Sequence, residues 1–260
     1  MGKRGKPVAE GQVILKSEYE IMKMAEAGQY NALFFRELGQ YIKAGLSTMD
    51  LEDFACAFCA KHGLFPTFKA EPGYHWALCV SINEEVVHGI PTKQKIIQDG
   101  DIVSVDIGVT LDGYIGDSCY TYLIGNVAPP AKKLCDATRE SLDKAIKIIR
   151  PGATIGDIGH AIQSHVEPLG FSVVREYVGH GVGTRMHEPP SIPHYGQPGT
   201  GLVLQAGMVI AVEPMINAGG WETEVLKDHW TVVTKDRQLS AQYEHTIAVV
   251  PGGCRVLTSG

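Results

Sequence analysis

An internal repeat is the feature of this 260-residue sequence that most restricts how the chain can fold. Residues that typically begin or end helices return after a constant shift of 107 positions: Gly45, Ser47, Asp50 and Gly63 recur as Gly152, Thr154, Asp157 and Gly170. The apolar run at residues 100–106 recurs at the same shift at residues 207–213. One shift shared by helix starts, helix ends and a strand predicts two structurally equivalent halves.

Each half is expected to contain two helices and an antiparallel sheet. Capping patterns and helix-ending glycines predict helices over about residues 17–44, 47–63, 130–149 and 154–170. Apolar runs predict strands over about residues 76–82, 101–124, 171–178, 207–217, 229–234 and 243–250. Helices on one side of an antiparallel sheet define an α+β architecture. The expected organisation is an N-terminal tail at residues 1–16 and one domain at residues 17–260, with halves at about 17–125 and 126–258.

Charge and cysteine content argue against several other classes of protein. The formal net charge of −6 gives no support to nucleic-acid binding, and the basic start Lys3-Arg4-Lys6 is typical of a solvated tail. No apolar run approaches the roughly 20 residues that a membrane-spanning helix needs, so we expect a cytoplasmic protein without membrane contact. Six scattered cysteines favour reduced thiols. Cys56 and Cys59 lie in an expected helix, which favours buried thiols over a redox or zinc pair.

Asp106 and Asp117 flank a predicted hairpin. If the turn is centred on residues 111–112, opposed residue numbers sum to 223 and the two acids face each other. If Asp112-Gly113 forms the turn, the sum is 225 and each acid faces a position two residues from the other. Both registers put the carboxylates on one face of the sheet. Because the strand is apolar on both faces, we expect these like charges to be buried, which requires a neutralising cation.

Three further side chains complete a candidate metal site. His180 lies in a glycine-rich segment, Glu213 ends an apolar strand at the position equivalent to Asp106, and Glu244 precedes the apolar run at residues 247–250. Four carboxylates match two divalent cations in charge, since −4 + 4 = 0. Oxygen ligands with one imidazole suit Mn, Fe, Co or Zn ions. Two such ions activate a water molecule for amide hydrolysis. No GxSxG or HExxH motif offers a competing hydrolytic site.

Two segments of the sequence resemble the type I methionine aminopeptidases. Residues 177–195, which contain His180 and His187, are similar to the signature segment of that family, and residues 81–91, which contain His88, are similar to its upstream segment. The similarity extends from about Ser17 to Leu257. The resemblance implies the pita-bread fold, in which two pseudo-symmetric halves surround a central metal cleft. Residues 17–260 would then form a single catalytic domain.

The resemblance also implies a role for each candidate site residue. The ligands of two divalent ions (Co, Mn, Fe or Zn) would be Asp106, Asp117, His180, Glu213 and Glu244. Asp106 and Glu244 would bridge the ions, Asp117 would bind one ion through both oxygens, and His180 would bind the other. Glu213 would also handle the proton of the bridging water. His88 and His187 would contact the substrate near the scissile amide and act in catalysis. The methionine pocket would be lined by Tyr74, Cys79 and Trp230.

One loop departs from the family pattern. Family members commonly carry a Cys and a Tyr shortly before the pair that corresponds to Gly73-Tyr74, whereas this chain has Phe68 and Glu71 in that loop. Met186 also stands where an aromatic residue is frequent. We expect Glu71 to point to solvent, because a carboxylate prefers water to a dry pocket.

The expected activity is removal of N-terminal methionine from nascent polypeptides whose second residue is small. An Xaa-Pro aminopeptidase or prolidase would share the fold and metals, but those relatives usually carry a large additional N-terminal domain. A type II enzyme would need a helical insertion between His180 and Glu213, and the 33 positions between them leave no room for it. A non-catalytic pita-bread binding module would be expected to lose ligands. We expect a monomer that acts on nascent chains and would contact the ribosome, if at all, through its folded surface.

Overall fold

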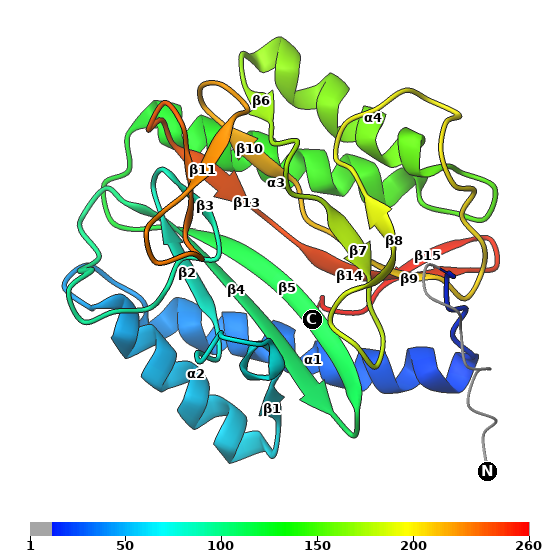
Figure 1. Cartoon of the computed structure of the whole chain (residues 1–260), viewed down its shortest axis with the longest axis horizontal. Helices are drawn as coiled ribbons and strands as arrows, with labels where there is room; N and C mark the ends of the chain where they lie inside the picture. The colour runs from blue at the N-terminus through cyan, green and yellow to red at the C-terminus, as the bar shows by residue number, and fades with distance from the viewer. Residues whose placement is uncertain (1–11, 260) are drawn as a thin grey trace.

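The computed structural model describes residues 12–259 of the chain, and helices and antiparallel strands make up most of this part (Figure 1). The basic residues at positions 3, 4 and 6 lie outside the described residues. The helices are α1 (Glu18–Tyr41), α2 (Thr48–His62), α3 (Pro129–Ile148) and α4 (Ile155–Val166), with short 3-10 helices η1 (Thr67–Ala70) and η2 (Glu167–Leu169). No helix in this part of the chain is long and apolar enough to cross a bilayer.

Local sequence explains where the helices begin and end. Ser17, Ser47 and Thr154 each form a complete capping box, in which the hydroxyl accepts the N–H of the residue three positions later and the acid there accepts the cap N–H. Gly63 ends α2 in the left-handed conformation, with φ of 66°, and Gly170 ends η2 in the same way, with φ of 91°. The four predicted helices are confirmed, although α1 ends at Tyr41 rather than near residue 44.

The strands form four antiparallel sheets among the described residues. The first sheet contains β1 (Phe65–Pro66), β2 (Cys79–Ile82), β4 (Ile102–Leu111) and β5 (Tyr114–Leu123). The second contains β15 (Gly253–Val256), β14 (His245–Val250), β9 (Val209–Val212), β7 (Gly179–Gly181) and β8 (Glu188–Ile192). Two smaller sheets contain β13 (Ser240–Gln242), β10 (Met215–Asn217) and β6 (Ser172–Val173), and β11 (Thr223–Val225), β12 (Val232–Thr234) and β3 (Glu85–Val87).

The hairpin between β4 and β5 selects one of the two predicted registers. Asp106 pairs with Cys119 and Gly108 pairs with Asp117, so opposed residue numbers sum to 225. The turn is Asp112-Gly113, with φ of 51° and 82°, which is the left-handed geometry that suits a two-residue hairpin. The two acids therefore lie diagonally on one face of the sheet.

The predicted repeat is present in the backbone hydrogen bonds. Isolated antiparallel bridges join Ser47 to Ile96 and Thr154 to Val203, so both partners differ by 107 positions. The N–H of Gly45 donates to Ile97 O, and the N–H of Gly152 donates to Leu204 O at the same shift. Strand β4 begins 107 positions before β9, and α1 ends 107 positions before α3. The α+β fold with two pseudo-symmetric halves is confirmed.

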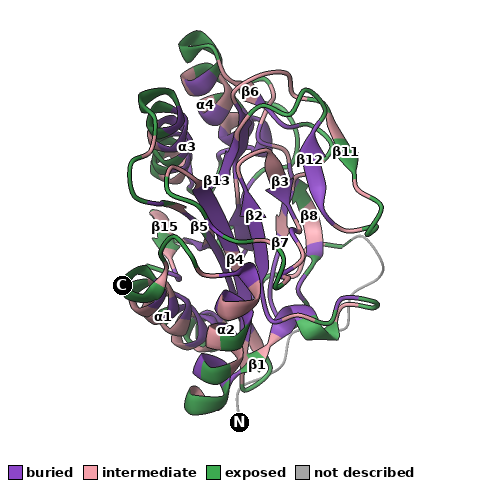
Figure 2. Ribbon diagram, turned by 90° about the vertical axis from the view of Figure 1, so that its left-hand side faces the viewer, coloured by how far each residue is buried: buried purple, intermediate pink, exposed green. Residues whose placement is uncertain are grey.

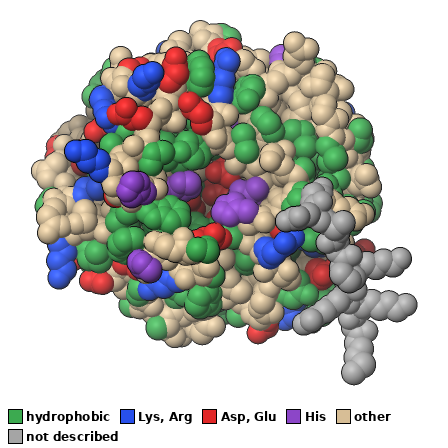
Figure 3. Space-filling view, viewed as in Figure 1, with side chains coloured by type: hydrophobic (Ala, Val, Ile, Leu, Met, Phe, Trp, Pro, Cys, Tyr) green, Lys and Arg blue, Asp and Glu red, His purple; other side chains and the backbone are tan. Residues whose placement is uncertain are grey.

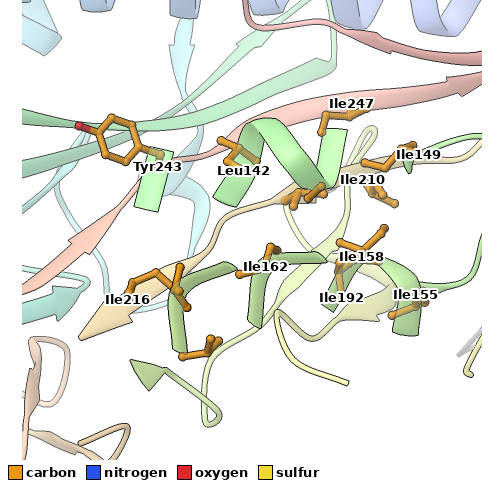
Figure 4. Close-up of a cluster of buried hydrophobic side chains, with 14 of the residues drawn as sticks. Leu142, Ile149, Ile155, Ile158, Ile162, Ile192, Ile210, Ile216, Tyr243 and Ile247 are labelled. Atoms are coloured by element: carbon orange, nitrogen blue, oxygen red, sulfur yellow. The ribbon is translucent and has the colours of Figure 1, made fainter. Parts of the chain in front are cut away.

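Helices and sheets form layers, with the strands buried between the helices and the opposite loops (Figure 2). One apolar cluster lies between α3, α4 and the second large sheet, and includes Leu142, Ile158, Ile162, Ile210 and Ile247 (Figure 4). A second cluster lies between α1, α2 and the first sheet, and includes Phe34, Leu51, Val105 and Ile107. Each half therefore has its own core.

Hydrogen bonds from β5 to the segment around β14 join the halves along the middle of the molecule. The Thr246 hydroxyl accepts the N–H of Asp117 at 3.0 Å and donates to Asp117 O at 2.8 Å. The N–H of Glu244 donates to Cys119 O at 2.9 Å. These bonds fix acids from the two halves beside each other.

Candidate metal centre

The five predicted ligands come from both halves and line one cavity of about 200 Å³. Asp106 lies on β4 and Asp117 on β5, whereas His180 lies on β7. Glu213 directly follows β9, and Glu244 directly precedes β14. Val212 of β9 pairs with His245 of β14, so Glu213 and Glu244 lie side by side where the pairing of these two strands ends. The cavity opens on the face shown in Figure 3, where acidic side chains lie in a hollow bordered by histidines.

Glycines beside His180 allow its strand to lie between two neighbours. A Cβ on Gly179 would lie 2.3 Å from Ala211 O, and a Cβ on Gly181 would lie 2.2 Å from Pro189 O. His180 itself pairs with Ala211 on β9 and Ser191 on β8. Because positions 179 and 181 carry no side chain, β7 lies close to both β8 and β9. This close packing of the strands fixes the position of the His180 imidazole.

The ligand atoms lie close enough together to hold divalent cations. His180 Nε2 is 3.6 Å from Asp117 Oδ2 and 3.5 Å from Glu213 Oε1. Asp117, His180 and Glu244 each offer one ligand atom within 4.8 Å of the others. Three carboxylate oxygens in the cluster, Asp106 Oδ1, Asp117 Oδ1 and Glu244 Oε1, are buried without a hydrogen-bond partner. Buried oxygens without partners cost free energy, and bound cations would satisfy them.

The raised pKa values of the four acids also indicate a cation-binding site. Burial raises the pKa of Asp106 to about 7. Burial and then the neighbouring negative charges raise the pKa values of Asp117, Glu213 and Glu244 well above their ordinary range. Such shifts mean that the cluster resists carrying its full charge until cations neutralise it. Burial lowers the pKa of His180 to about 4, which leaves the imidazole neutral and able to bind a metal at pH 7.

Glu213 is further held by two polar neighbours that the sequence did not reveal. Its N–H donates to His194 Nε2 at 3.1 Å, and Gln242 Nε2 donates to Glu213 Oε2 at 3.2 Å. Burial lowers the pKa of His194 to about 3, so this imidazole is neutral and accepts at Nε2. These contacts orient one oxygen of Glu213 away from Gln242 and toward His180.

Both predicted catalytic histidines line the same cavity. His88 adopts a left-handed backbone with φ of 59°, uncommon for a residue with a side chain, and packs edge-on against Tyr177 and Trp230. Burial and the nearby His187 lower the pKa of His88 to about 4. The His187 ring centroid lies 4.5 Å from that of His180. The two histidines are thus placed beside the acids.

The predicted pocket residues also line the cavity. The Tyr74 hydroxyl lies 2.9 Å from Leu78 O and 3.1 Å from Cys79 Sγ, and its ring packs edge-on against Trp230. The wall includes further residues: Phe68, Val87, Tyr177, Val178, Met186 and Met215.

Glu71 does not simply point to solvent as the sequence suggested. It lines the cavity, and its Oε1 lies 3.8 Å from His187 Nδ1. The reason is the tight loop around it, which keeps Glu71 between two buried pocket residues, Phe68 and Tyr74.

A buried ion pair joins Glu188, the residue that follows His187, to Lys16. Lys16 Nζ is 2.5 Å from Glu188 Oε2, and the exposed fractions of the two side chains are 5% and 1%. The N–H of Lys16 also donates to Gly207 O at 2.7 Å. The ion pair therefore holds the residue next to His187 in place.

Replacing Lys16 with Met should lower the free energy of unfolding by about 3–5 kcal/mol, because it leaves the Glu188 carboxylate buried without its partner. Urea unfolding would measure the change. Lys23→Met is the matched control: its partners are Glu26 and Asp112, both on the surface, so the loss should stay below about 1 kcal/mol. Equal effects of the two substitutions would contradict this prediction.

Comparison with known proteins agrees with a hydrolytic metal centre. The family model "Metallopeptidase family M24" matches residues 22–251. The chain is 50% identical to methionine aminopeptidase 1 of Bacillus subtilis over 246 residues, which cover 95% of this chain and 99% of the relative. It is 47% identical to methionine aminopeptidase B of Synechocystis over 97% of this chain and 93% of the relative.

Solved structures show the same relationship. The methionine aminopeptidase of Thermotoga maritima superposes with a TM-score of 0.94 at 46% identity, covering 96% of this chain and 100% of that chain. The Xaa-Pro dipeptidase of Bacillus anthracis superposes with a TM-score of 0.75 at 23% identity, covering 95% of this chain but 62% of that chain. The second likeness shows the fold alone.

The fold and the cluster of acids define a metallopeptidase of the pita-bread type. The chain belongs to metallopeptidase family M24, and within that family to the methionine aminopeptidases. It is therefore a metal-dependent hydrolase.

Proposed function

We propose that this chain removes the N-terminal methionine from new polypeptides whose second residue is small. The observation that carries the proposal is the convergence of four buried carboxylates and His180 beside a cavity walled by apolar and aromatic side chains. Relatives that are 43–50% identical over nearly the whole chain bear the name methionine aminopeptidase.

The proposed ligands of two divalent ions are Asp106, Asp117, His180, Glu213 and Glu244. Asp106 and Glu244 would help to hold both ions, Asp117 would hold one of them, and His180 would hold the other. The partnerless oxygens of three of these acids support the assignment, because each needs a positive partner. Oxygen ligands with one imidazole suit Co, Mn, Fe or Zn.

Divalent ions held there would supply Lewis acidity, which polarises a carbonyl and lowers the pKa of a water molecule so that it can lose a proton and attack. Glu213 would accept the proton of that water and later deliver it to the leaving amine, because its carboxylate adjoins the cluster while Gln242 holds one of its oxygens. His88 and His187 would donate hydrogen bonds to the substrate amide as negative charge develops on its oxygen. The low pKa of His88 keeps its ring neutral, with one N–H to donate.

Methionine selection would depend on the shape of the cavity. Tyr74 and Cys79 are almost fully buried in its wall, and their mutual contact fixes both side chains. Trp230 closes the wall against Tyr74. An unbranched thioether packs well against such aromatic and sulfur-containing surface.

Peptide hydrolysis tests the proposal against its rival. With Co, Mn, Fe or Zn present, the protein should release methionine from Met-Gly-Met-Met and leave Xaa-Pro peptides intact. A prolidase would show the opposite preference. Release of Xaa from Xaa-Pro at a greater kcat/KM than methionine release would overturn the assignment. A non-catalytic binding module would hydrolyse neither peptide with any metal.

We further propose that residues 17–260 act as one catalytic domain with halves at about 17–125 and 126–258, preceded by a tail at residues 1–16 whose last residue, Lys16, is anchored to the domain through Glu188. The protein would act as a cytoplasmic monomer on nascent chains and meet the ribosome through its folded surface.

A further inference from the structure

The feature that the proposed mechanism does not use is the carboxylate of Glu71 at the mouth of the cavity. The N–H of Glu71 donates to Phe68 O at 3.0 Å, and the N–H of Tyr74 donates to Glu71 O at 3.1 Å. Phe68 and Tyr74 are buried in the cavity wall. The backbone of Glu71 is therefore fixed by the two residues that form the pocket, which places its side chain at the entrance.

The exposure of the lining residues shows which end of the cavity Glu71 occupies. Tyr74 and Cys79 are 3% and 4% exposed, so they lie at the closed end. The side chains of Glu71 and His187 are 36% and 61% exposed and lie 3.8 Å apart, so they lie at the open end. A peptide whose first side chain fills the closed end must leave past these two residues.

Glu71 is also the acid in the cavity that the metal ions would not neutralise. The other four lining acids are the proposed metal ligands, whose charges two divalent ions cancel. Among the described residues that line the cavity there is no lysine or arginine, and the basic side chain that faces the Glu71 carboxylate is His187, whose Nδ1 lies 3.8 Å from Glu71 Oε1. The exit path therefore carries a carboxylate that no lysine or arginine of the cavity lining neutralises.

We propose that Glu71 is a specificity-determining residue that favours substrates with a basic third residue and disfavours those with an acidic one. The inference rests on the proposed methionine aminopeptidase function. The second residue is small, so the third residue carries the first side chain after methionine that is long enough to reach Glu71. A lysine or arginine there would lie within a few ångströms of the carboxylate, whereas a glutamate would repel it.

Three peptides that differ only at the third residue test the proposal: Met-Ala-Lys-Trp, Met-Ala-Gln-Trp and Met-Ala-Glu-Trp. In 10 mM salt, kcat/KM should be about tenfold greater for the lysine peptide than for the glutamate peptide, as expected for unit charges a few ångströms apart in water. In 1 M salt the ratio should fall below about twofold, because the Debye length is then only ~3 Å. A shape effect would not depend on salt.

Substitutions identify the residue responsible. Glu71→Gln keeps the shape and should reduce the lysine-to-glutamate ratio to below about twofold, and Glu71→Lys should invert it. Asp53→Asn is the matched control, because it removes an exposed carboxylate from α2, outside the cavity, and should leave the ratio as in the unsubstituted protein. A ratio that Glu71→Gln leaves unchanged would overturn the proposal.

A binding measurement separates the charge effect from turnover. Calorimetry with reduced-amide analogues of the lysine and glutamate peptides should show the same order of Kd, lost in Glu71→Gln. Equal Kd values for the two analogues in the unsubstituted protein would also overturn the proposal. Failure of the proposed function would look different, because no methionine would then be released from any of the three peptides.

Discussion

Removal of divalent metal with EDTA is expected to abolish methionine release and to lower the melting temperature, and returning Mn or Co should restore both. The four acids lose the cations that neutralise them, and a ligand at a thousand times its Kd stabilises a fold by about 4 kcal/mol. Peptide turnover and thermal unfolding, each with the metal content measured, would test this prediction. EDTA already saturated with the same metal that the protein carries is the control for effects of the chelator itself.

The metal-free protein should also respond to pH in a defined direction. Its buried acids have pKa values raised above those of the unfolded chain, as Asp106 does at about 7. The unfolded chain therefore releases these protons first, and stability present below about pH 4 is lost as the pH rises through 7. Metal-loaded protein should lack this loss. Full activity after verified metal removal would exclude the two-metal centre.

His187→Ala and Asp106→Asn are expected to separate catalysis from metal binding. His187→Ala should lower kcat by about 100-fold or more while metal content stays intact, because it removes a hydrogen bond that strengthens in the transition state. Asp106→Asn keeps the shape of the side chain but removes a bridging charge, so metal occupancy and kcat should fall together. Elemental analysis of each purified variant alongside steady-state kinetics gives both readouts.

His160→Ala is the matched control for these variants, because this histidine is exposed on α4 and does not line the cavity. Its kcat and metal content should stay within the error of the unsubstituted protein. Loss of metal from His187→Ala would mean that His187 is itself a ligand, and the assignment of the five ligands would have to change.

Local sequence was sufficient for most of the fold. Capping boxes at Ser17, Ser47 and Thr154 form through side chains three residues apart, so their signal is short-range and survives in the structure. The turn Asp112-Gly113 is equally local, and it selected the hairpin register between two alternatives. Shorter strands such as β6 and β10 were harder to delimit, because their ends depend on pairing between residues 172–173 and 216–217.

Contacts distant in sequence explain what was missed around the site. Lys16 and Glu188 are 172 positions apart, and neither residue carries a local sign of its partner. His194 is likewise 19 positions from Glu213, whose N–H donates a hydrogen bond to it. Glu71 was expected in solvent because a charge prefers water, but the hydrogen bonds of its loop determine where its backbone lies. The side chain stays partly exposed at the open end of the cavity, so it meets both solvent and the cavity.

The division of the proposed ligands between the halves has a consequence for motion. Asp106 and Asp117 come from the first half, and His180, Glu213 and Glu244 come from the second. A clamshell movement that separated the halves would pull the two sets apart and release the ions. We therefore expect substrate capture to proceed without hinge opening, with adjustment confined to side chains at the entrance such as His187. The active site would thus be rigid and would not close around the substrate, so the backbone should be nearly the same before, during and after each turnover.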